Sequence, residues 1–304
     1  MVLPIILAVV EIFGLFTIGI FARLKGYINE KEIDRWSHMV LDLLFPAFIF
    51  SSIISGFKPE KLNELWPLPF LGFGLVLYGT IAGILLKFGL FSKNPDKRLT
   101  FIYICAVNNS AYLPIIIIKN IWGEDALANL FFFNLGTTLG IWTIGVSILG
   151  ASTLKNIVKN LFTPNLFAAL LALFFSVSGY TSSIPGVINR IITNAGSTAV
   201  PLMLVLIGAS LCNKHALRIS WPVIYITTIR LIIIPLSAIV ILKMLPVTSD
   251  VFTITAVVSL MPAAVASVIM TRRFGGDSNY AASTALVSTV MAILTVPVAM
   301  SILF

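Results

Sequence analysis

Charged side chains are scarce in this sequence: Asp, Glu, Lys and Arg make up only 11% of its 304 residues, while 58% of the residues are hydrophobic. A soluble domain carries roughly 25% charged residues, so this composition argues against a chain surrounded by water. No long polar stretch separates the apolar runs, which argues against a separate aqueous domain. The composition therefore predicts a polytopic all-α membrane protein in contact with the lipid bilayer.

Cysteine and histidine are also rare. Cys105 and Cys212 lie in or beside apolar runs, so the sequence offers neither a disulfide framework nor a CxxC metal site. His38 and His215 belong to no HExxH motif, and no nucleophile, base and carboxylate occur at a recognisable spacing. We therefore expect no enzyme activity, no metal and no cofactor. The net charge of +8 is scattered over short loops, and we expect no nucleic-acid partner.

Runs of about 20 apolar residues predict ten membrane-spanning helices. The first is interpreted as a retained span, because residues 1–20 contain Glu11, lack a basic n-region and exceed the length of a signal-peptide core. The predicted spans are 2–22, 36–56, 66–88, 100–119, 127–150, 161–178, 186–211, 221–243, 250–271 and 279–303.

The Lys and Arg residues divide unevenly between the two sides of the predicted membrane. The odd-numbered loops hold fourteen of the twenty: Arg23, Lys25, Lys31, Arg35, Lys87, Lys93, Lys97, Arg98, Lys155, Lys159, Lys214, Arg218, Arg272 and Arg273. The even-numbered loops hold Lys58, Lys61, Lys119, Arg190 and Lys243. Cytoplasmic loops carry the excess of Lys and Arg. We therefore expect the odd-numbered loops on the cytoplasmic side of the cell (inner) membrane and both termini on the outside.

Four landmarks recur in order along the two halves of the chain. Gly26-Tyr27 is repeated as Gly179-Tyr180, Pro46 as Pro201, Trp66-Pro67 as Trp221-Pro222, and Trp122-Gly123-Glu124-Asp125 as Phe274-Gly275-Gly276-Asp277, at offsets of 153, 155, 155 and 152. Because five spans per half is an odd number, the second half enters the membrane inverted. The sequence therefore predicts two inverted five-helix repeats, residues 1–150 and 151–304.

Spans 4 and 9 each carry a central proline beside small or polar residues. Span 4 contains the candidate binding residues Asn108, Asn109, Ser110, Tyr112 and Pro114, and span 9 contains Ser259, Pro262 and Ala263. Pro114 removes a backbone donor and clashes with the carbonyl of Ser110, so a break is expected there. Two broken helices at corresponding positions point to a transport site, with their free amide ends suited to an anion. The alternative is a pair of ordinary kinks, with the Asn side chains bonding a neighbouring helix.

In these motifs the chain resembles the auxin efflux carrier family, whose small bacterial members include malonate-type transporters. The resemblance extends over the whole chain and rests on Leu43-Leu44-Phe45-Pro46-Ala47, Asn108-Asn109-Ser110, Leu113-Pro114, Trp122-Gly123 and Met261-Pro262-Ala263. It implies crossed, broken helices 4 and 9, a scaffold of spans 1, 2, 6 and 7, and transport of small organic anions. The long central loop of the plant carriers is missing, so auxin is not the expected substrate. A homodimer through the scaffold helices is also considered.

Three ionisable residues lie inside predicted spans, where charge is costly. Arg230 follows Trp221 by about 14 Å of helix, close to the midplane. We expect it to offset the carbonyl ends of the broken helices and to attract the anion; the alternative is an ion pair with Glu11 or Asp42. We expect Glu11 and Asp42 either to form hydrogen bonds with neighbouring helices or to couple transport to protons.

Span 5 offers Asn134 and Thr138 one helical turn apart, where they either border the site or pack against a neighbouring helix. The adjacent run 131–133 is all Phe, and we expect it in the core or facing lipid.

Three functions remain open at this stage. A carrier of small carboxylates is the first. A cation-coupled symporter or antiporter with the same crossed-helix fold is the second; such a carrier usually has carboxylates at its ion site, whereas spans 4 and 9 offer amides and hydroxyls. A non-transporting sensor or membrane enzyme is the third, although no output domain supports it.

Overall fold

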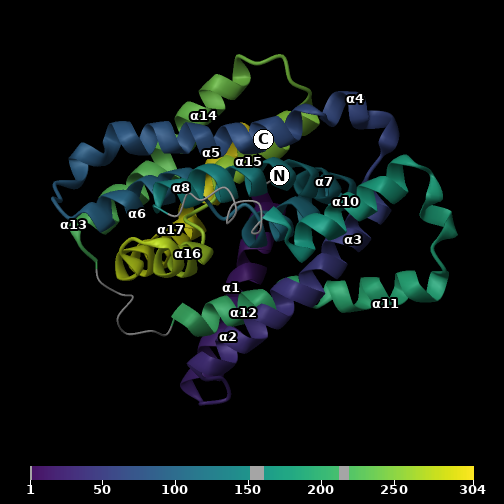
Figure 1. The fold of residues 1–304 in the computed structure, drawn as a ribbon, viewed down its shortest axis with the longest axis horizontal. Coiled ribbons are helices and arrows are strands. Elements are labelled where there is room, and N and C mark those ends of the chain that lie inside the picture. Colours follow the sequence, from purple (N-terminus) through teal and green to yellow (C-terminus); the bar gives the residue numbers. More distant parts are fainter. Residues whose placement is uncertain (1, 151–160, 212–218) are drawn as a thin grey trace.

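The structure, a computed structural model, describes residues 2–150, 161–211 and 219–304, and every regular element in these ranges is a helix (Figure 1). Cys212 and the basic residues Lys155, Lys159, Lys214 and Arg218 lie outside the described residues. The first half comprises α1 (Val2–Leu24), α2 (Glu30–Met39), η1 (Val40–Leu44), α3 (Phe45–Gly56), η2 (Pro59–Lys61), α4 (Leu62–Leu65), α5 (Pro67–Leu86), η3 (Lys87–Leu90), α6 (Pro95–Ala106), α7 (Tyr112–Gly140), η4 (Ile141–Gly145) and α8 (Val146–Ile148). The second half comprises α10 (Pro164–Val177), η5 (Tyr180–Ser183), α11 (Gly186–Ser197), α12 (Ala199–Leu211), α13 (Trp221–Thr228), η6 (Ile229–Ile233), α14 (Ile234–Lys243), α15 (Ser249–Ser259), α16 (Ala266–Phe274) and α17 (Ser278–Leu303).

Seven continuous helical stretches in the described chain are long and apolar enough to cross a membrane. Predicted spans 6 and 9 fall below this length, because α10 has 14 residues, and α15 and α16 have 11 and 9. Predicted span 4 is divided between α6 and the first part of α7, and α7 continues into span 5 through Gly123, whose φ of 83° is not helical. Ten spans therefore remain a prediction, and seven is the number that helix length alone supports.

The repeated landmarks have matching local structure. Gly26 and Gly179 have φ values of 77° and 73°, a conformation that costs glycine little. Gly123 and Gly275 also have positive φ, at 83° and 113°, and each lies where one helix gives way to the next. The two Trp-Pro pairs each begin a helix, α5 and α13. Corresponding positions of the two halves thus turn the chain in the same way.

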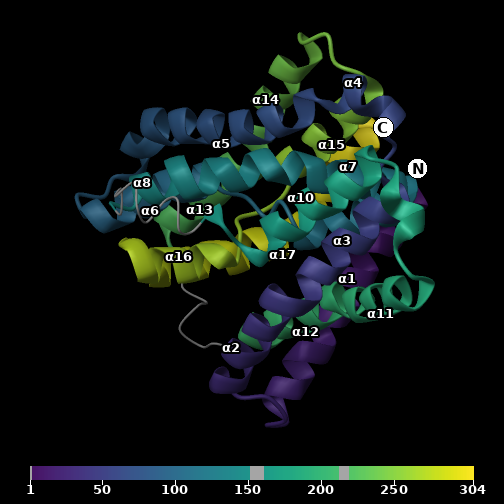
Figure 2. The same ribbon diagram turned by 45° about the vertical axis from the view of Figure 1, so that its right-hand side comes forward.

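The helices form two groups. Helices α2, α11 and α12 lie lowest in Figures 1 and 2, α1 and α3 rise from them into the middle of the molecule, and α5, α7, α14 and α15 lie above. Within the lower group, α1 packs closely on α12. A Cβ atom added to Gly19 would overlap the carbonyl oxygen of Val205, and one added to Gly208 would overlap that of Phe16. Glycine at these two positions lets the helix backbones touch, as small residues do in membrane interfaces.

Gly19→Ala is expected to lower the free energy of unfolding by about 1–3 kcal/mol, because the new methyl group meets backbone and the helices must separate. Gly14→Ala is the matched control in the same helix, where an added Cβ meets nothing within 4 Å. That change should leave stability unchanged or raise it slightly, since Ala favours helix. Thermal unfolding in detergent measures both, and equal melting temperatures for the two variants would contradict the close packing.

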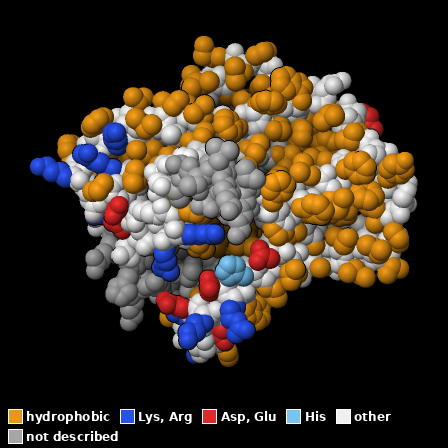
Figure 3. Space-filling model, in the orientation of Figure 1, with side chains coloured by type: hydrophobic (Ala, Val, Ile, Leu, Met, Phe, Trp, Pro, Cys, Tyr) orange, Lys and Arg blue, Asp and Glu red, His pale blue; other side chains and the backbone are white. Residues whose placement is uncertain are grey.

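Large apolar side chains cover much of the surface, as Figure 3 shows. Phe70 and Leu85, for example, are each 69% exposed, which is normal where lipid is the solvent.

Charged side chains gather at the lower end, over α2 (Figures 1 and 3). This short helix begins with a capping box, in which Asn29 accepts from the Glu32 amide and Glu32 accepts from the Asn29 amide.

Contacts between loops collect at two ends of the molecule. Lys58 forms an ion pair with Asp125, and Lys61 with Asp250 at 2.9 Å, which joins the loops after predicted spans 2, 4 and 8. Elsewhere, Trp221 donates from Nε1 to the Gly89 carbonyl at 3.1 Å, and the Asp277 amide donates to Thr100 Oγ1 at 2.8 Å. Even-numbered loops thus meet one another, and odd-numbered loops likewise.

Candidate functional site: paired helix breaks and a cavity

The helix of predicted span 4 is interrupted. α6 ends at Ala106, residues 107–111 are not helical, and α7 begins at Tyr112. Pro114 is the third residue of α7, where its missing N–H costs nothing, whereas a continuous helix would bring its ring against the carbonyl of Ser110. The break predicted from Pro114 is therefore confirmed.

A second interruption lies in predicted span 9, and the two meet. α15 ends at Ser259, α16 begins at Ala266, and Pro262 lies between them. Asn108 and Ala263 form an isolated antiparallel bridge, and the Asn109 amide donates to the Pro262 carbonyl at 2.8 Å. The Asn108 side-chain amide also donates to the Val258 carbonyl. Each break thus satisfies backbone groups of the other, as a helix interrupted at membrane depth requires.

Arg230 binds the carbonyl ends of both interrupted helices. Its side chain comes from the π-helical turn η6 and is only 1% exposed. Its three guanidinium nitrogens donate to separate carbonyls: Nη1 to Cys105 at 3.0 Å, Nη2 to Ser259 at 2.8 Å and Nε to Met261 at 3.2 Å. Cys105 lies at the end of α6 and Ser259 at the end of α15. The positive charge therefore faces the two helix ends that carry partial negative charge.

Neither intramembrane carboxylate pairs with Arg230 among the described residues. Glu11 on α1 accepts a hydrogen bond from Asn120 of α7 at 2.8 Å, and Asp42 is exposed on η1. The ion pair considered from the sequence is thus not the arrangement found. Whether either carboxylate couples transport to protons stays a prediction.

A cavity of about 270 Å³ adjoins the two breaks, next to the first residues of α7 and α16. Its residues come from η1, α3 and α6, from the two breaks, from the start and middle of α7, from η4, from α10 and from α16. They are Leu41, Phe45, Ile49, Tyr103, Val107, Asn108, Asn109, Ser110, Ala111, Tyr112, Phe131, Asn134, Leu135, Thr137, Thr138, Ile141, Trp142, Asn165, Leu166, Ala169, Ala264, Val265, Ala266 and Met270. This volume is just below the usual range for small-molecule sites, roughly 300–1,000 Å³.

Several amide groups in the cavity lack protein partners. Asn109 is 4% exposed; its Oδ1 accepts from the Tyr112 amide at 3.1 Å, while its Nδ2 has no partner. Asn134 donates from Nδ2 to the Ser110 carbonyl at 3.0 Å, and its Oδ1 is without a partner. The Oδ1 of Asn165 and the hydroxyl of Thr137 are also unsatisfied. Unpaired buried polar atoms are costly, so a polar ligand or water is the natural partner here.

The residues predicted for the site fall into two groups, those that line the cavity and those that do not. Those that line the cavity are Asn108, Asn109, Ser110, Tyr112, Asn134 and Thr138. Those that do not are Pro114, Ser259, Pro262, Ala263 and Arg230, which shape or support the breaks. Their role in binding a substrate stays a prediction.

Sequence reasoning missed other parts of the lining. Asn165 and Thr137 were not singled out, because a polar residue near the end of a span or between helices is ordinary. Phe131 belongs to a run expected in the core or facing lipid. It is buried, and it also lines the cavity, with its ring 6.3 Å from that of Phe45. Only the folded chain shows that these positions share a wall.

No described residue that lines the cavity carries a charge. Its polarity comes from amides and hydroxyls, and from the N-terminal ends of α7 and α16, each of which carries about half a positive charge. Tyr112 and Ala266, the first residues of these helices, both lie in the lining.

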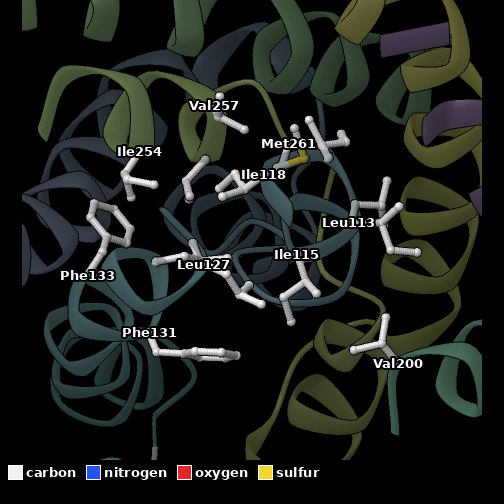
Figure 4. Close-up of a cluster of buried hydrophobic side chains, with 14 of the residues drawn as sticks. Leu113, Ile115, Ile118, Leu127, Phe131, Phe133, Val200, Ile254, Val257 and Met261 are labelled. Carbon is white, nitrogen blue, oxygen red and sulfur yellow. The ribbon is translucent and has the colours of Figure 1, made fainter. Parts of the chain in front are cut away.

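Beyond the breaks, the chain is packed with apolar side chains. Leu113, Ile115, Ile118 and Leu127 of α7 meet Ile254, Val257 and Met261 from α15 and the span 9 break (Figure 4). Along the chain, most of these residues lie between the breaks and the even-numbered loops, whereas Leu127 follows such a loop and Met261 lies in the break itself. A second cavity of about 200 Å³ lies among those loops and is bordered by both ion pairs, Lys58 with Asp125 and Lys61 with Asp250.

Apolar helices, breaks that pair at membrane depth and a partly polar cavity beside them define a membrane transport protein. The chain belongs to the family described as "Membrane transport protein", of the auxin efflux carrier type, whose model matches residues 4–156 and again residues 148–300. This confirms the resemblance seen in the motifs, and the double match shows that the two halves are repeats of one unit. Membership indicates a transporter and not an enzyme.

Two relatives are similar to the chain along nearly its whole length. An "Uncharacterized transporter" of Methanothermobacter thermautotrophicus is 23% identical over 294 residues, which is 95% of each chain. The "Uncharacterized transporter MJ1031" of Methanocaldococcus jannaschii is 24% identical over 289 residues, or 93% of each.

Proposed function

We propose that this transporter is a secondary carrier of small organic anions that works by alternating access around the paired breaks of spans 4 and 9. One observation carries the proposal: the starts of α7 and α16 border one cavity together with Asn109, whose buried Nδ2 has no protein partner. Two helix N-termini and a free N–H donor attract an anion. Among the described residues, the same lining offers no carboxylate for a cation, which favours this function over a cation-coupled relative.

In this proposal the chain crosses the membrane ten times, in two inverted five-span repeats, residues 1–150 and 151–304, with helices 4 and 9 crossing at their breaks. The antiparallel bridge between Asn108 and Ala263 supports the crossing. The matching glycine turns, and the gathering of odd and even loops at separate ends, support the inverted repeat.

In this proposal the cavity opens toward the odd-numbered loops, which the positive-inside rule assigns to the cytoplasm. Its lining includes Asn165 near the start of α10 and Met270 near the end of α16, both close to odd loops. The apolar cluster and the two ion pairs close the opposite side (Figure 4). This arrangement corresponds to an inward-facing state of a carrier in the cell membrane.

Spans 1, 2, 6 and 7 would form the scaffold, against which the remaining spans move; a homodimer through the scaffold belongs to the same proposal. The hydrogen bond from Asn120 to Glu11 joins scaffold helix α1 to α7 and must break if the two bodies slide. Glu11 is therefore the better candidate for coupling to protons, and Asp42 the second.

Flux in proteoliposomes tests the function. Purified protein should carry radiolabelled monocarboxylates or dicarboxylates down an imposed gradient, in the absence of sodium. Sodium-dependent flux would favour the cation-coupled alternative. If folded protein carries no organic anion at all, the proposal is overturned. Flux should persist in Asn194→Ala, which removes an exposed amide outside the cavity.

Labelling of single cysteines tests the orientation. Lys243→Cys, in an even loop, should react with an impermeant maleimide added to intact cells, and Lys93→Cys, in an odd loop, should react only after the membrane is opened. The parent chain, which already contains Cys105 and Cys212, supplies the background. Reaction at Lys93→Cys in sealed cells would contradict both the topology and the inverted repeat.

A further inference from the structure

One short loop holds the far ends of both broken spans. Lys58 and Lys61 follow Gly56, the last residue of α3, by two and five residues. Lys58 forms an ion pair with Asp125, in the turn where predicted span 4 gives way to span 5. Lys61 forms an ion pair at 2.9 Å with Asp250, in the first turn of α15, which is the first part of span 9. We call these two ion pairs the lysine clip.

The elements that the clip joins are also in close contact. A Cβ atom added to Gly56 would overlap the carbonyl oxygen of Glu124, so the end of α3 touches the turn that carries Asp125. The clip borders the cavity of about 200 Å³ among the even-numbered loops. One side of this cavity is formed by Gly56, Lys58, Lys61 and Leu65, and the other by Trp122, Asp125, Ala126, Asn129, Asp250, Thr253 and Ile254. Because its two sides come from separate parts of the chain, the cavity can widen only if the clip separates.

The clip has the strength expected of a contact that forms and breaks. The side chains of Lys58 and Asp125 are each 53% exposed, and those of Lys61 and Asp250 are 44% and 39% exposed. Ion pairs that are this exposed are individually weak. A contact that exists in only one of two states favours that state by its own free energy. Two weak pairs can therefore bias an equilibrium between the states without locking it.

We infer that the lysine clip sets the balance between the two states of the carrier. While both ion pairs are formed, the clip ties the end of scaffold helix α3 to spans 4 and 9 and keeps the even-numbered side closed. When both pairs break, the cavity between them opens. The inference rests on the alternating access of the proposed function and assigns a conformational role to Lys58 and Lys61.

Thiol labelling of protein in detergent tests the clip. Asn129 lines the cavity and is 6% exposed, so Asn129→Cys should react slowly with a maleimide while the clip is closed. Adding Lys58→Gln and Lys61→Gln removes both ion pairs and should raise the labelling rate roughly twofold to thirtyfold, the range for two exposed pairs. The parent chain supplies the background. Detergent leaves both faces of the protein accessible, so the result does not depend on the orientation in the membrane.

A third ion pair provides the matched control. Lys119 pairs with Glu124 at 2.8 Å, and their side chains are 46% and 44% exposed, much like those of the clip. Both residues lie beside Gly123 in the same turn, so this pair does not reach the loop after α3. Lys119→Gln added to Asn129→Cys should therefore leave the labelling rate unchanged. Thr253→Cys, in another part of the same lining, serves as the reporter if Asn129→Cys does not fold.

Exchanging the charges separates the ion pair from other effects of substitution. Lys58→Asp places a second carboxylate next to Asp125 and should speed the labelling. Adding Asp125→Lys restores an ion pair with the charges reversed, and should slow the labelling again. If the reversed pair labels as fast as Lys58→Asp alone, the attraction between these residues does not hold the cavity closed.

Salt should act on the parent clip in the same direction as its removal. The Debye length falls from about 10 Å at 0.1 M salt to about 3 Å at 1 M, which screens exposed pairs. Labelling of Asn129→Cys should therefore become faster with salt, and the variant that also lacks both lysines should show little change. An equal acceleration of the two would contradict an electrostatic clip.

Flux measured on the same preparations distinguishes the clip from the proposed function. Folded Lys58→Gln/Lys61→Gln protein that labels within about twofold of the Lys119→Gln control would overturn the inference, and parental flux of organic anions would leave the proposed function standing. Faster labelling without flux of any organic anion would support the clip and count against the proposed function.

Discussion

Arg230→Gln is expected to lower the free energy of unfolding by about 3 kcal/mol or more and to abolish transport. The guanidinium serves three buried carbonyls, on Cys105, Met261 and Ser259. An unsatisfied buried acceptor costs roughly 1–3 kcal/mol, and the single amide of Gln cannot reach all three. The carbonyl ends of α6 and α15 would also lose their opposing charge. Thermal unfolding and proteoliposome flux measure the two effects.

Arg230→Lys separates charge from geometry. It keeps the positive charge, but an ammonium lacks the planar fork that spans three acceptors, so stability should recover only in part. Double variants with Glu11→Gln or Asp42→Asn should not rescue Arg230→Gln, because neither carboxylate contacts the guanidinium. Full rescue by either would revive the ion pair considered from the sequence.

Asn109→Asp is expected to abolish detectable anion binding while keeping the fold. The carboxylate can still accept from the Tyr112 backbone amide, as Asn109 Oδ1 does now, so the hydrogen bond at the start of α7 survives. The free Nδ2 donor is lost, and a negative charge stands where the anion would bind. Substrate-dependent thermal stabilisation measures the effect, and a loss of at least tenfold in affinity is expected.

Asn109→Ala should weaken binding as well, with a further loss of about 1 kcal/mol in stability from the lost hydrogen bond to the Tyr112 backbone amide. Asn194→Ala, on the exposed side of α11, is the matched amide control and should bind normally. Asn108 calls for separate treatment, since its amide joins the two breaks through Val258 and its loss would mix folding with binding. If a folded Asn109→Ala variant binds with the parental affinity, the role of Asn109 is limited to its hydrogen bond with the Tyr112 backbone amide.

Much of the architecture could be predicted because it depends on local chemistry. Hydropathy located the apolar helices, and Pro114 located the break before α7, since proline excludes a continuous helix through the preceding turn. The repeat was visible in glycines and Trp-Pro pairs, because turns and helix starts have strict backbone requirements. The family resemblance followed from the same motifs and is confirmed by the double family match.

Contacts between distant segments could not be predicted in the same way. An arginine at midplane needs partners, yet nothing local to Arg230 says whether they are carboxylates or carbonyls 125 residues away in the chain, as Cys105 is. Asn165 has the ordinary appearance of a polar residue near a helix start, and Phe131 that of a core residue. Both became parts of one cavity only when α10 and α7 came together.

By itself, the sequence determined that this protein is a helical membrane protein with interrupted helices, because composition, proline and glycine act through the chain's own neighbourhood and through its solvent. The tertiary structure alone decided which backbone groups of the two breaks bond to each other. It also decided that Arg230 binds the carbonyl ends of α6 and α15, and that the amide ends of α7 and α16 border a cavity. These depend on the positions of groups more than a hundred residues apart, such as Asn109 and Pro262, which only the packed fold brings within a hydrogen bond.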